Sequence, residues 1–251
     1  ATTRFRLLEL MDLNSSIFKK MLIKAPGTYN HSIMVANLSE AAAKEINADH
    51  YLAKVGAFYH DIGKINDSAI YIENKKEGEK IEKEPLEYCR LIISHVEKGI
   101  RLAKELKLPD EVIDFIREHH GQSTMTFFYH QALEKASGES NSFVNQSDFQ
   151  YPGPKPRTRE TALVMLADAI EAASRSVTEP TYTKLETLVK KIIHNKLNEG
   201  ELENCDLTLK DINKIQKAFI RILAGIFHTR IEYPDKEDIR KLEKQVNKAN
   251  E

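Results

Sequence analysis

Tryptophan is absent from the 251-residue sequence, and cysteine, proline and glycine are scarce, at 2, 8 and 10 residues. Two cysteines, Cys89 and Cys205, are too few for the disulfide framework that stabilises small secreted domains. The low glycine and proline content, beside many leucines, alanines, glutamates and lysines, favours long helices over a turn-rich β fold. We therefore expect an all-α chain whose two thiols are free and take no part in chemistry.

Neither sign of charge is in excess, because 37 Lys and Arg face 38 Asp and Glu. This balance argues against a strongly basic surface for sequence-independent binding of nucleic acid, so no nucleic-acid polymer is expected as a partner. A run of about 18 apolar residues is also lacking, and the segment as it stands is expected to be soluble. Arg4 and Arg6 are nevertheless typical of the cytoplasmic side of a preceding membrane span.

Apolar residues recur at helical spacing along most of the chain. Thr28 is a candidate N-cap, Pro109 suits the start of a helix, and Gly63 and Gly121 suit helix ends. The pattern predicts two short helices around 7–11 and 17–22, followed by helices over 28–48, 51–62, 86–106, 109–121, 124–135, 159–175, 185–197 and 207–231.

Two segments lack this periodicity. Residues 66–84 are rich in Lys, Glu, Gly and Asn, which predicts a solvated loop, with room for a short helix, that packs little. Residues 138–157 are rich in Gly, Ser, Asn, Gln and Pro, and a loop of that length in a compact domain is typically a lid, a binding loop or a disordered insert. No internal repeat is found. We expect linker helices over 1–24, one domain over 25–233 and a charged tail over 234–251.

Histidines on the predicted helices are the strongest functional signal. Any one of them is better explained as a hydrogen-bonded core residue, and His95, which shares a face with Leu91 and Ile92, illustrates that alternative. The joint pattern is different, because ligand-type side chains recur on consecutive helices of one bundle. Such a pattern is typical of a metal site built between helices. The residues concerned are His31, His60, Asp61, His95, His119, His120 and Asp168.

These seven side chains exceed what a single ion can bind. If Asp61 bridges two ions, each ion receives about four protein ligands and keeps open positions for a bridging hydroxide and for substrate oxygens. Two ions about 3.5–4 Å apart suit in-line displacement at phosphorus. The pattern therefore predicts phosphodiester hydrolysis with two divalent transition-metal ions. Iron, manganese, cobalt, nickel and zinc all suit these ligands, and iron or manganese is preferred.

Residues 60–64 read HDIGK, and the order H, HD, H, HH, D resembles the dinuclear branch of the HD-domain phosphohydrolase superfamily. The stretches APGTYNHS at 25–32, VANL at 35–38, PKP at 154–156 and VMLADA at 164–169 are further similar to the membrane-anchored cyclic di-AMP phosphodiesterases of the PgpH type. This resemblance extends from about Arg6 to Tyr233. No GYP sequence is present, so the sister branch that acts on cyclic di-GMP is less well supported.

The resemblance implies a helical HD-domain bundle that cleaves cyclic di-AMP, or a related nucleotide, to the linear dinucleotide pApA. The family carries seven transmembrane helices before its HD domain, which implies the cytoplasmic domain of a bacterial inner membrane protein. It also implies that Asp61 bridges two metals. His31, His60, Asp61 and Asp168 would hold one of them, and Asp61, His95, His119 and His120 the other.

Several further residues are candidates for contact with substrate. Lys64, just past the HD pair, can reach a non-bridging phosphate oxygen and stabilise transition-state charge, or it can be a solvated lysine. Arg175, two helical turns beyond Asp168, can meet the second phosphate of a dinucleotide or can pair with Glu171. Base stacking is a further possibility for Tyr71, Tyr129 and Tyr151, although core or surface packing is the simpler interpretation for each.

Three alternatives to a cyclic di-AMP phosphodiesterase remain at this stage. The chain can be an HD phosphohydrolase that acts on another nucleotide or cyclic dinucleotide. It can be a nucleotide-binding sensor whose metals are structural and which turns nothing over. A helical scaffold with incidental histidines requires seven spaced ligands and the HDIGK motif to coincide by chance. The oligomeric state is left open.

Overall fold

The computed structural model describes residues 2–75, 83–137 and 143–228, and all regular elements in these ranges are helical. Their only β feature is an isolated antiparallel bridge between Thr124 and Gln150. The prediction of an all-α fold is therefore confirmed for the described part of the chain. Over the same ranges, no helix has both the length and the apolar character needed to span a bilayer.

Helices follow one another with mostly short connections, and the sequence-based ranges agree with them to within a few residues. In chain order the α-helices are α1 (Arg4–Leu10), α2 (Ser16–Lys24), α3 (Pro26–Glu45), α4 (His50–Tyr59), α5 (Pro85–Glu105), α6 (Asp110–Glu118), α7 (Thr126–Ala136), α8 (Arg159–Ser174), α9 (Tyr182–Asn198) and α10 (Leu209–His228). The 3-10 segments are η1 (Ile62–Ile70), η2 (Ile72–Asn74) and η3 (Gln146–Phe149).

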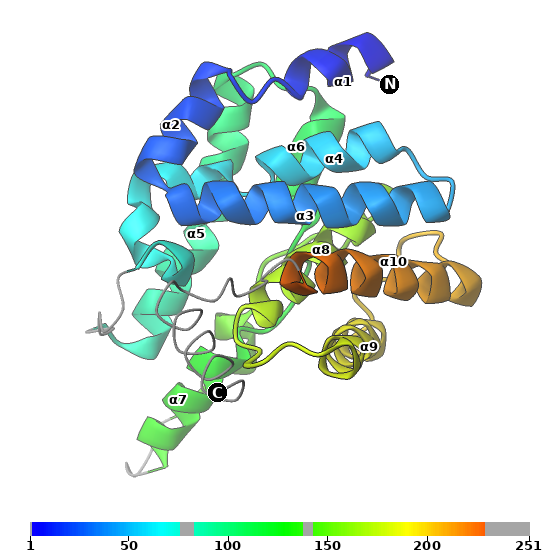
Figure 1. Ribbon diagram of the computed structural model, residues 1–251. Helices are drawn as coiled ribbons and strands as arrows, with labels where there is room; N and C mark the ends of the chain where they lie inside the picture. The colour runs from blue at the N-terminus through cyan, green and yellow to red at the C-terminus, as the bar shows by residue number, and fades with distance from the viewer. Residues whose placement is uncertain (1, 76–82, 138–142, 229–251) are drawn as a thin grey trace, which may run out of the picture.

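Helices α3, α4 and α8 form the centre of the fold. Helix α3 packs against α4 and α8, and α10 lies along α3 with α9 beside it (Figure 1). Ala36, Ala42 and Ala57 are fully buried, and their small side chains let neighbouring helices approach closely. Helix α7 instead projects away from the central helices, and its Phe128 packs with Cys89 of α5 in a separate small apolar cluster (Figure 1).

The start of α3 differs from the prediction. Thr28 is not the N-cap, because the helix already begins at Pro26, with Ala25 before it. Proline suits the first helical position because its fixed φ is that of a helix and its missing N–H would have no partner there. The Thr28 side chain is buried and bonds to η2 instead. As a consequence, His31 lies in the second turn of the helix and not in the first.

Residues 66–75 contain short helical turns, which the prediction allowed, but they pack more closely than expected. They form η1 and η2, in which the ring of Tyr71 is buried and Asn74 bonds to the start of α3. Polar side chains such as Asn74 make these contacts with partners far away in the sequence. Composition alone therefore does not predict them. Residues 76–82, which carry the rest of the predicted loop, lie outside the described residues.

The described part of the second segment without periodicity, residues 143–157, packs against the connection between α6 and α7. Phe149 and Tyr151 are buried, and the Phe149 carbonyl accepts a hydrogen bond from the Met125 amide at 2.8 Å. This packing excludes a disordered insert over 143–157, whereas residues 138–142 lie outside the described residues. The segment connects α7 to α8 and places Tyr151 against His120, just after the end of α6.

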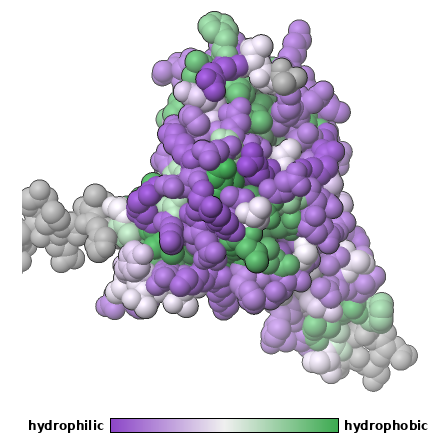
Figure 2. Space-filling view, turned by 90° about the vertical axis from the view of Figure 1, so that its right-hand side faces the viewer, coloured by the Kyte–Doolittle hydropathy of each residue, from purple (hydrophilic) through white to green (hydrophobic). Residues whose placement is uncertain are grey.

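The last two helices cover the side of α3 and α8. Thr181 caps α9 by accepting a hydrogen bond from the Lys184 amide, and α10 packs on both α3 and α9. The face shown in Figure 2 is mostly hydrophilic, with apolar side chains in small patches, as expected for a surface rich in Lys and Glu. The predicted tail over 234–251 lies outside the described residues.

Candidate metal centre

The seven candidate ligands converge where several helices meet. His31 comes from α3, His60 and Asp61 from the turn just after α4, and His95 from α5. The prediction had put His60 and Asp61 in the last turn of their helix, but α4 ends at Tyr59 and the pair lies in the sharper turn into η1. His119 and His120 follow the end of α6, and Asp168 comes from α8. All seven are buried except His120, whose side chain is 20% exposed.

The convergent side chains form two groups that share one carboxylate. Within each group, one ligand atom from each residue lies within 4.8 Å of the others, a spacing that can surround a metal ion. Asp61 belongs to both groups, and its Oδ2 lies 3.2 Å from His60 Nε2 while its Oδ1 lies 3.4 Å from His95 Nε2. The groups are His31, His60, Asp61 and Asp168, and Asp61, His95, His119 and His120.

Hydrogen bonds on the far side of the rings orient the inward nitrogens. His60 Nδ1 lies 2.7 Å from the Ala57 carbonyl and His95 Nδ1 lies 2.7 Å from the Ile92 carbonyl. Because a carbonyl only accepts, each Nδ1 carries a proton and donates, which leaves Nε2 as the nitrogen that faces the centre and can bind a metal once it is unprotonated. His119 Nδ1 donates in the same way to the carbonyl of Ile116, at 3.0 Å.

Polar atoms at the centre lack the hydrogen bonds that burial normally demands. The Nε2 atoms of His31, His60 and His120 and both carboxylate oxygens of Asp61 are buried without a hydrogen-bond partner. Buried polar atoms are nearly always paired, and unpaired ones mark a functional site or a bound water or ion. Inward imidazole nitrogens gathered around the Asp61 carboxylate therefore fit divalent transition-metal ions.

The electrostatics favour positive charge at this centre. Burial alone would raise the pKa of the Asp61 carboxyl, but the Lys64 ammonium and the His60 imidazole hold it well below its usual range. Burial would lower the pKa of His60, yet Asp61 outweighs it and the pKa rises to about 10. The carboxylates thus keep a proton on the His60 imidazole at a position where a metal cation would bind. Metal binding should therefore release protons.

The second group of imidazoles is different, because its members are neutral. Burial lowers the pKa of His95 to about 4, and burial together with the charge on His60 lowers that of His119 to about 3. An imidazole must be unprotonated to bind a metal. These two residues are therefore ready to act as ligands across the whole physiological pH range.

Lys64 lies at the centre and is not a solvated lysine. Its side chain is 11% exposed, and Nζ lies 2.8 Å from Asp61 Oδ2 and 3.1 Å from Glu73 Oε1. Arg175 makes the alternative contact that the sequence left open, because its guanidinium pairs with the Glu171 carboxylate at 2.8 Å. Its own side chain is 38% exposed at the edge of the site.

Glu171 was named in the sequence only as a partner for Arg175, yet the structure also pairs it with a candidate ligand. Its buried carboxylate accepts a short hydrogen bond from His31 Nδ1. A carboxylate behind a ligating histidine fixes the ring orientation and makes the ligand more basic. The sequence signal for this role is the spacing of three between Asp168 and Glu171, which places both on one face of α8.

Aromatic rings pack around the centre and are not free platforms for a base. The Tyr151 ring stacks on the His120 ring with 4.1 Å between centroids, and Tyr71 meets His95 edge-on at 5.9 Å. Tyr129 packs on Phe149 at 5.7 Å. The simpler interpretation from the sequence, packing of each tyrosine, therefore describes all three rings.

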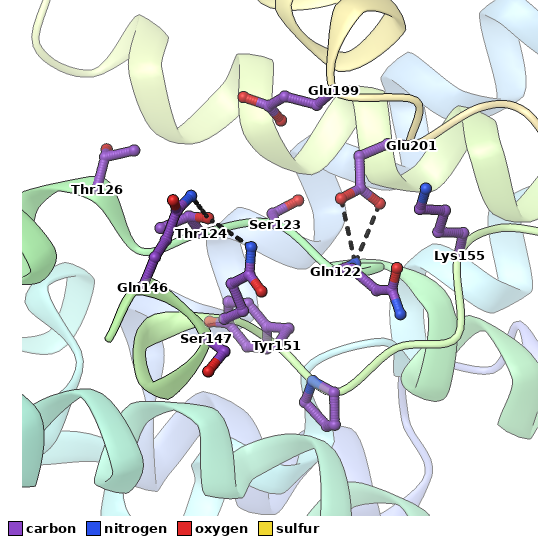
Figure 3. Close-up of a pocket in the computed structure, with 12 residues that line it drawn as sticks. Gln122, Ser123, Thr124, Thr126, Gln146, Ser147, Tyr151, Lys155, Glu199 and Glu201 are labelled. Carbon is purple, nitrogen blue, oxygen red and sulfur yellow. Dashed lines mark hydrogen bonds between the residues drawn. The ribbon is translucent and has the colours of Figure 1, made fainter. Parts of the chain in front are cut away.

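A polar pocket lies on the other side of Tyr151 (Figure 3). Its volume is about 640 Å³, and amide and hydroxyl side chains dominate its walls. Gln146 and Gln150 both donate to Thr124 Oγ1 at 3.1 Å, which ties the returning segment to the connection after α6. Tyr151 therefore lies at the boundary between this pocket and the ring of His120.

Residues 28–173 match the family described as HD domain. The chain is 43% identical to the cyclic-di-AMP phosphodiesterase PgpH of Bacillus subtilis over 92% of this chain and 32% of that protein. It is 41% identical to PgpH of Listeria monocytogenes over 94% of this chain and 32% of that protein. The chain therefore spans about a third of the length of these curated relatives.

A solved structure has the same fold. The crystal structure of the PgpH HD domain from L. monocytogenes in complex with cyclic-di-AMP matches with a TM-score of 0.80 and 40% sequence identity. The match covers 85% of this chain and 98% of that chain. The arrangement of helices described above is thus that of the Listeria domain over most of the length of this chain.

Proposed function

This chain belongs to the HD domain family, and from that premise we propose that it is a metal-dependent phosphodiesterase that opens cyclic di-AMP to linear pApA. One observation carries the proposal: two buried groups of imidazole and carboxylate ligands share Asp61. The choice of substrate is supported by relatives named for cyclic-di-AMP hydrolysis and by an HD domain crystallised with that nucleotide.

The ligands divide between two ions in this proposal, with Asp61 contributing to both. Iron or manganese is preferred because imidazole and carboxylate together suit both metals. The inward nitrogens support this division, since His31 Nε2 lies 2.9 Å from Asp168 Oδ1 and His60 Nε2 lies 3.2 Å from Asp61 Oδ2 within the same group. One ion is assigned His31, His60, Asp61 and Asp168, and the other Asp61, His95, His119 and His120.

The proposed reaction is hydrolysis of one phosphodiester bond. A hydroxide attacks phosphorus while the bond to the ribose 3′ oxygen breaks, so the product keeps a 5′ phosphate. When bound, the metal ions supply Lewis acidity to water and to the phosphate. Lys64 adds a buried positive charge beside Asp61, where it can meet a non-bridging oxygen as negative charge develops. Arg175, at the partly exposed edge, is the candidate for the second phosphate.

The domain limits and the cellular setting belong to the same proposal. We take residues 25–233 as the HD domain, preceded by linker helices over 1–24 and followed by a charged tail over 234–251. The resemblance to the PgpH type supports a place on the cytoplasmic side of a bacterial inner membrane, within a longer anchored protein. Fractionation of cells that express the full-length gene product tests this placement, and recovery in the soluble fraction would contradict it.

The first experiment combines metal analysis with a hydrolysis assay. The protein is purified anaerobically, its metal content is measured, and cyclic di-AMP is supplied with Fe²⁺ or Mn²⁺ while pApA is followed by chromatography. We expect about two metal ions per chain and formation of pApA. Two ions with cyclic di-AMP intact would keep the chemistry and reject the substrate, and a panel of other nucleotides would follow. Tight binding without turnover would identify a sensor.

Asp61→Ala tests the centre itself. The variant should lose metal, and turnover should fall by about 10³-fold or more because residues that act as one unit fail together. The helical fold should survive, since the surrounding core consists of apolar residues. Asp206→Ala, which changes an exposed aspartate, serves as the matched control and should behave as the unmodified protein. An Asp61→Ala protein that keeps its metal and its activity would refute the assignment.

A further inference from the structure

Lys64 has two carboxylate partners of different kinds. Asp61 lies 2.8 Å from Nζ and belongs to both candidate ligand groups, whereas Glu73 lies 3.1 Å away and belongs to neither. An ion bound by Asp61 would compete with Lys64 for the same Oδ2 atom. Glu73 is then the acceptor that continues to hold the ammonium group in place.

Glu73 is itself held firmly. Its Oε1 also accepts a hydrogen bond from Thr28 Oγ1 at 3.1 Å. The neighbouring Asn74 side chain accepts from the amides of Gly27 at 2.9 Å and Thr28 at 3.3 Å, and donates to Thr28 Oγ1 at 2.8 Å. We call Gly27, Thr28, Glu73 and Asn74 the clasp, because they lock η2 onto the first turn of α3.

The charges of Lys64 and of Glu73 in the clasp stabilise one another. Burial would lower the pKa of Lys64, but Asp61 and Glu73 outweigh it and the pKa is raised. Burial would raise the pKa of Glu73, but Lys64 outweighs it and the pKa is lowered. The face of the Tyr71 ring, 5.1 Å from Nζ, adds a cation–π contact. The ammonium group and the carboxylate therefore stay charged together, and the lysine chain has little freedom to leave.

We propose that Glu73 is a positioning residue, which holds the Lys64 ammonium beside the metal centre so that it meets a non-bridging oxygen of the phosphodiester. The role rests on the proposed phosphodiesterase function, because it gives Lys64 a phosphate to meet. Glu73 acts through Lys64 and does not touch the substrate. Neither the motif resemblance nor the candidate ligand groups assign it a role.

Glu73→Gln tests the proposal, because the amide keeps the size of the side chain and an acceptor for Thr28 but loses the charge. We expect kcat to fall about 10²-fold, as for a catalytic group displaced by about 1 Å, with unchanged metal content. Glu73→Asp keeps the charge and should recover part of the activity. Glu203→Gln is the matched control, since that carboxylate pairs with Lys155 and is 60% exposed; its activity should not change.

A double-mutant cycle with Lys64→Met separates positioning from a merely structural role. If Glu73 acts through Lys64, adding Glu73→Gln to Lys64→Met should lower kcat no further. Independent, additive losses would overturn the proposal, as would loss of metal in Glu73→Gln, which would make Glu73 a ligand.

The four proteins of the cycle are the unmodified protein, Glu73→Gln, Lys64→Met and the double variant. They also keep the failure of this proposal distinguishable from the failure of the proposed function. If the metal-loaded unmodified protein hydrolyses no cyclic di-AMP, the proposed function fails on that result alone. The pairing of Glu73 with Lys64 is then read from melting temperatures, where the two substitutions should again be non-additive. Additive shifts in melting temperature would overturn the positioning role whatever the substrate.

Discussion

His31 depends on a carboxylate that is not itself a candidate ligand. Glu171 bonds to Nδ1 of the ring and pairs with the partly exposed Arg175, so a buried carboxylate holds the ring from the side away from the centre. This arrangement leaves His31 Nε2 facing Asp168 Oδ1 at 2.9 Å. Orientation of the ring, and not only its presence, is therefore part of the design of this centre.

Glu171→Gln should weaken metal binding, because an amide is a poorer acceptor for His31 Nδ1 and makes the ring less basic. Loss of such a partner typically costs 10–100-fold in metal affinity, and we expect a decrease of about that size. Titration with a competing chelator measures it. Glu186→Gln, which alters an exposed pair with Lys190, is the control. Equal affinity in both variants would show that Glu171 does not orient the ligand.

Glu201 gives a prediction about pH. The side chain is 2% exposed, and burial raises its pKa above the ordinary 4.5, although the Gln122 amide donates to it. A raised carboxyl pKa in the folded state stabilises the fold at low pH, and this contribution is lost as pH rises through that pKa. The stability of Glu201→Gln relative to the unmodified protein should therefore rise as pH increases from 4.5 to 7. Melting temperatures across this range test the sign, and a constant difference would contradict it.

At the scale of elements, the clasp explains why a glycine stands at the second position of α3. A Cβ built on Gly27 would lie 1.9 Å from the Glu73 carbonyl oxygen, which is backbone and cannot move aside cheaply. Helix α3 and η2 therefore approach each other more closely than a residue with a Cβ at position 27 would allow. The approach lets the Gly27 amide reach Asn74 Oδ1 at 2.9 Å.

Gly27→Ala should separate η2 from α3. We expect destabilisation of about 1–3 kcal/mol, in the range of overpacked sites, and lower activity because Lys64 loses its support. Chemical denaturation and the hydrolysis assay measure the two effects. Gly225→Ala is the matched control, because a Cβ there meets nothing within 4 Å and the helix should gain slightly in stability. A Gly27→Ala protein with normal stability and turnover would show that the close approach is dispensable.

Most helices could be predicted from the sequence, and the errors occur where polar contacts replace apolar periodicity. The repeat of apolar residues locates α3, α5 and α8 because each buries a face in the core. The sequence predicts the start of α3 at Thr28 because threonine is a common N-cap, whereas the Thr28 side chain bonds to residues 73 and 74. The loop over 66–84 was judged by composition, which does not reveal that Glu73 and Lys64 pair.

At the scale of the whole molecule, the candidate ligands could be named from the sequence because they are of uncommon types in a recognisable order. Their number and spacing predicted a shared centre, and the structure brings all seven together. Residues that contact His31 or Lys64 without being candidate metal ligands could not be predicted in the same way. Glu171 and Glu73 are ordinary surface residue types, and only the folded chain shows that each pairs with a residue of the centre.

Metal should stabilise the entire fold, because the ligands join α3, α5 and α8 to the turns that follow α4 and α6. At a free metal concentration a hundredfold above Kd, the gain is about 2.7 kcal/mol, which corresponds to several degrees in melting temperature for a chain of this size. Chelation should lower the melting temperature by that amount, and added metal should restore it. Asp61→Ala should respond to neither treatment, and an equal response would place the stabilising ion elsewhere.

The distance along the chain between the parts of this centre has a consequence for biogenesis. His31 and the carboxylate behind it are separated by 140 residues, so the ligand group that includes His31 and Asp168 is not complete until α8 has left the ribosome and docked on α3. A nascent chain interrupted before that point has the residues of the group Asp61, His95, His119 and His120 but lacks Asp168 and Glu171. Binding of both ions would then require completed folding, and chains that fail late in assembly would lack one ion and stay inactive.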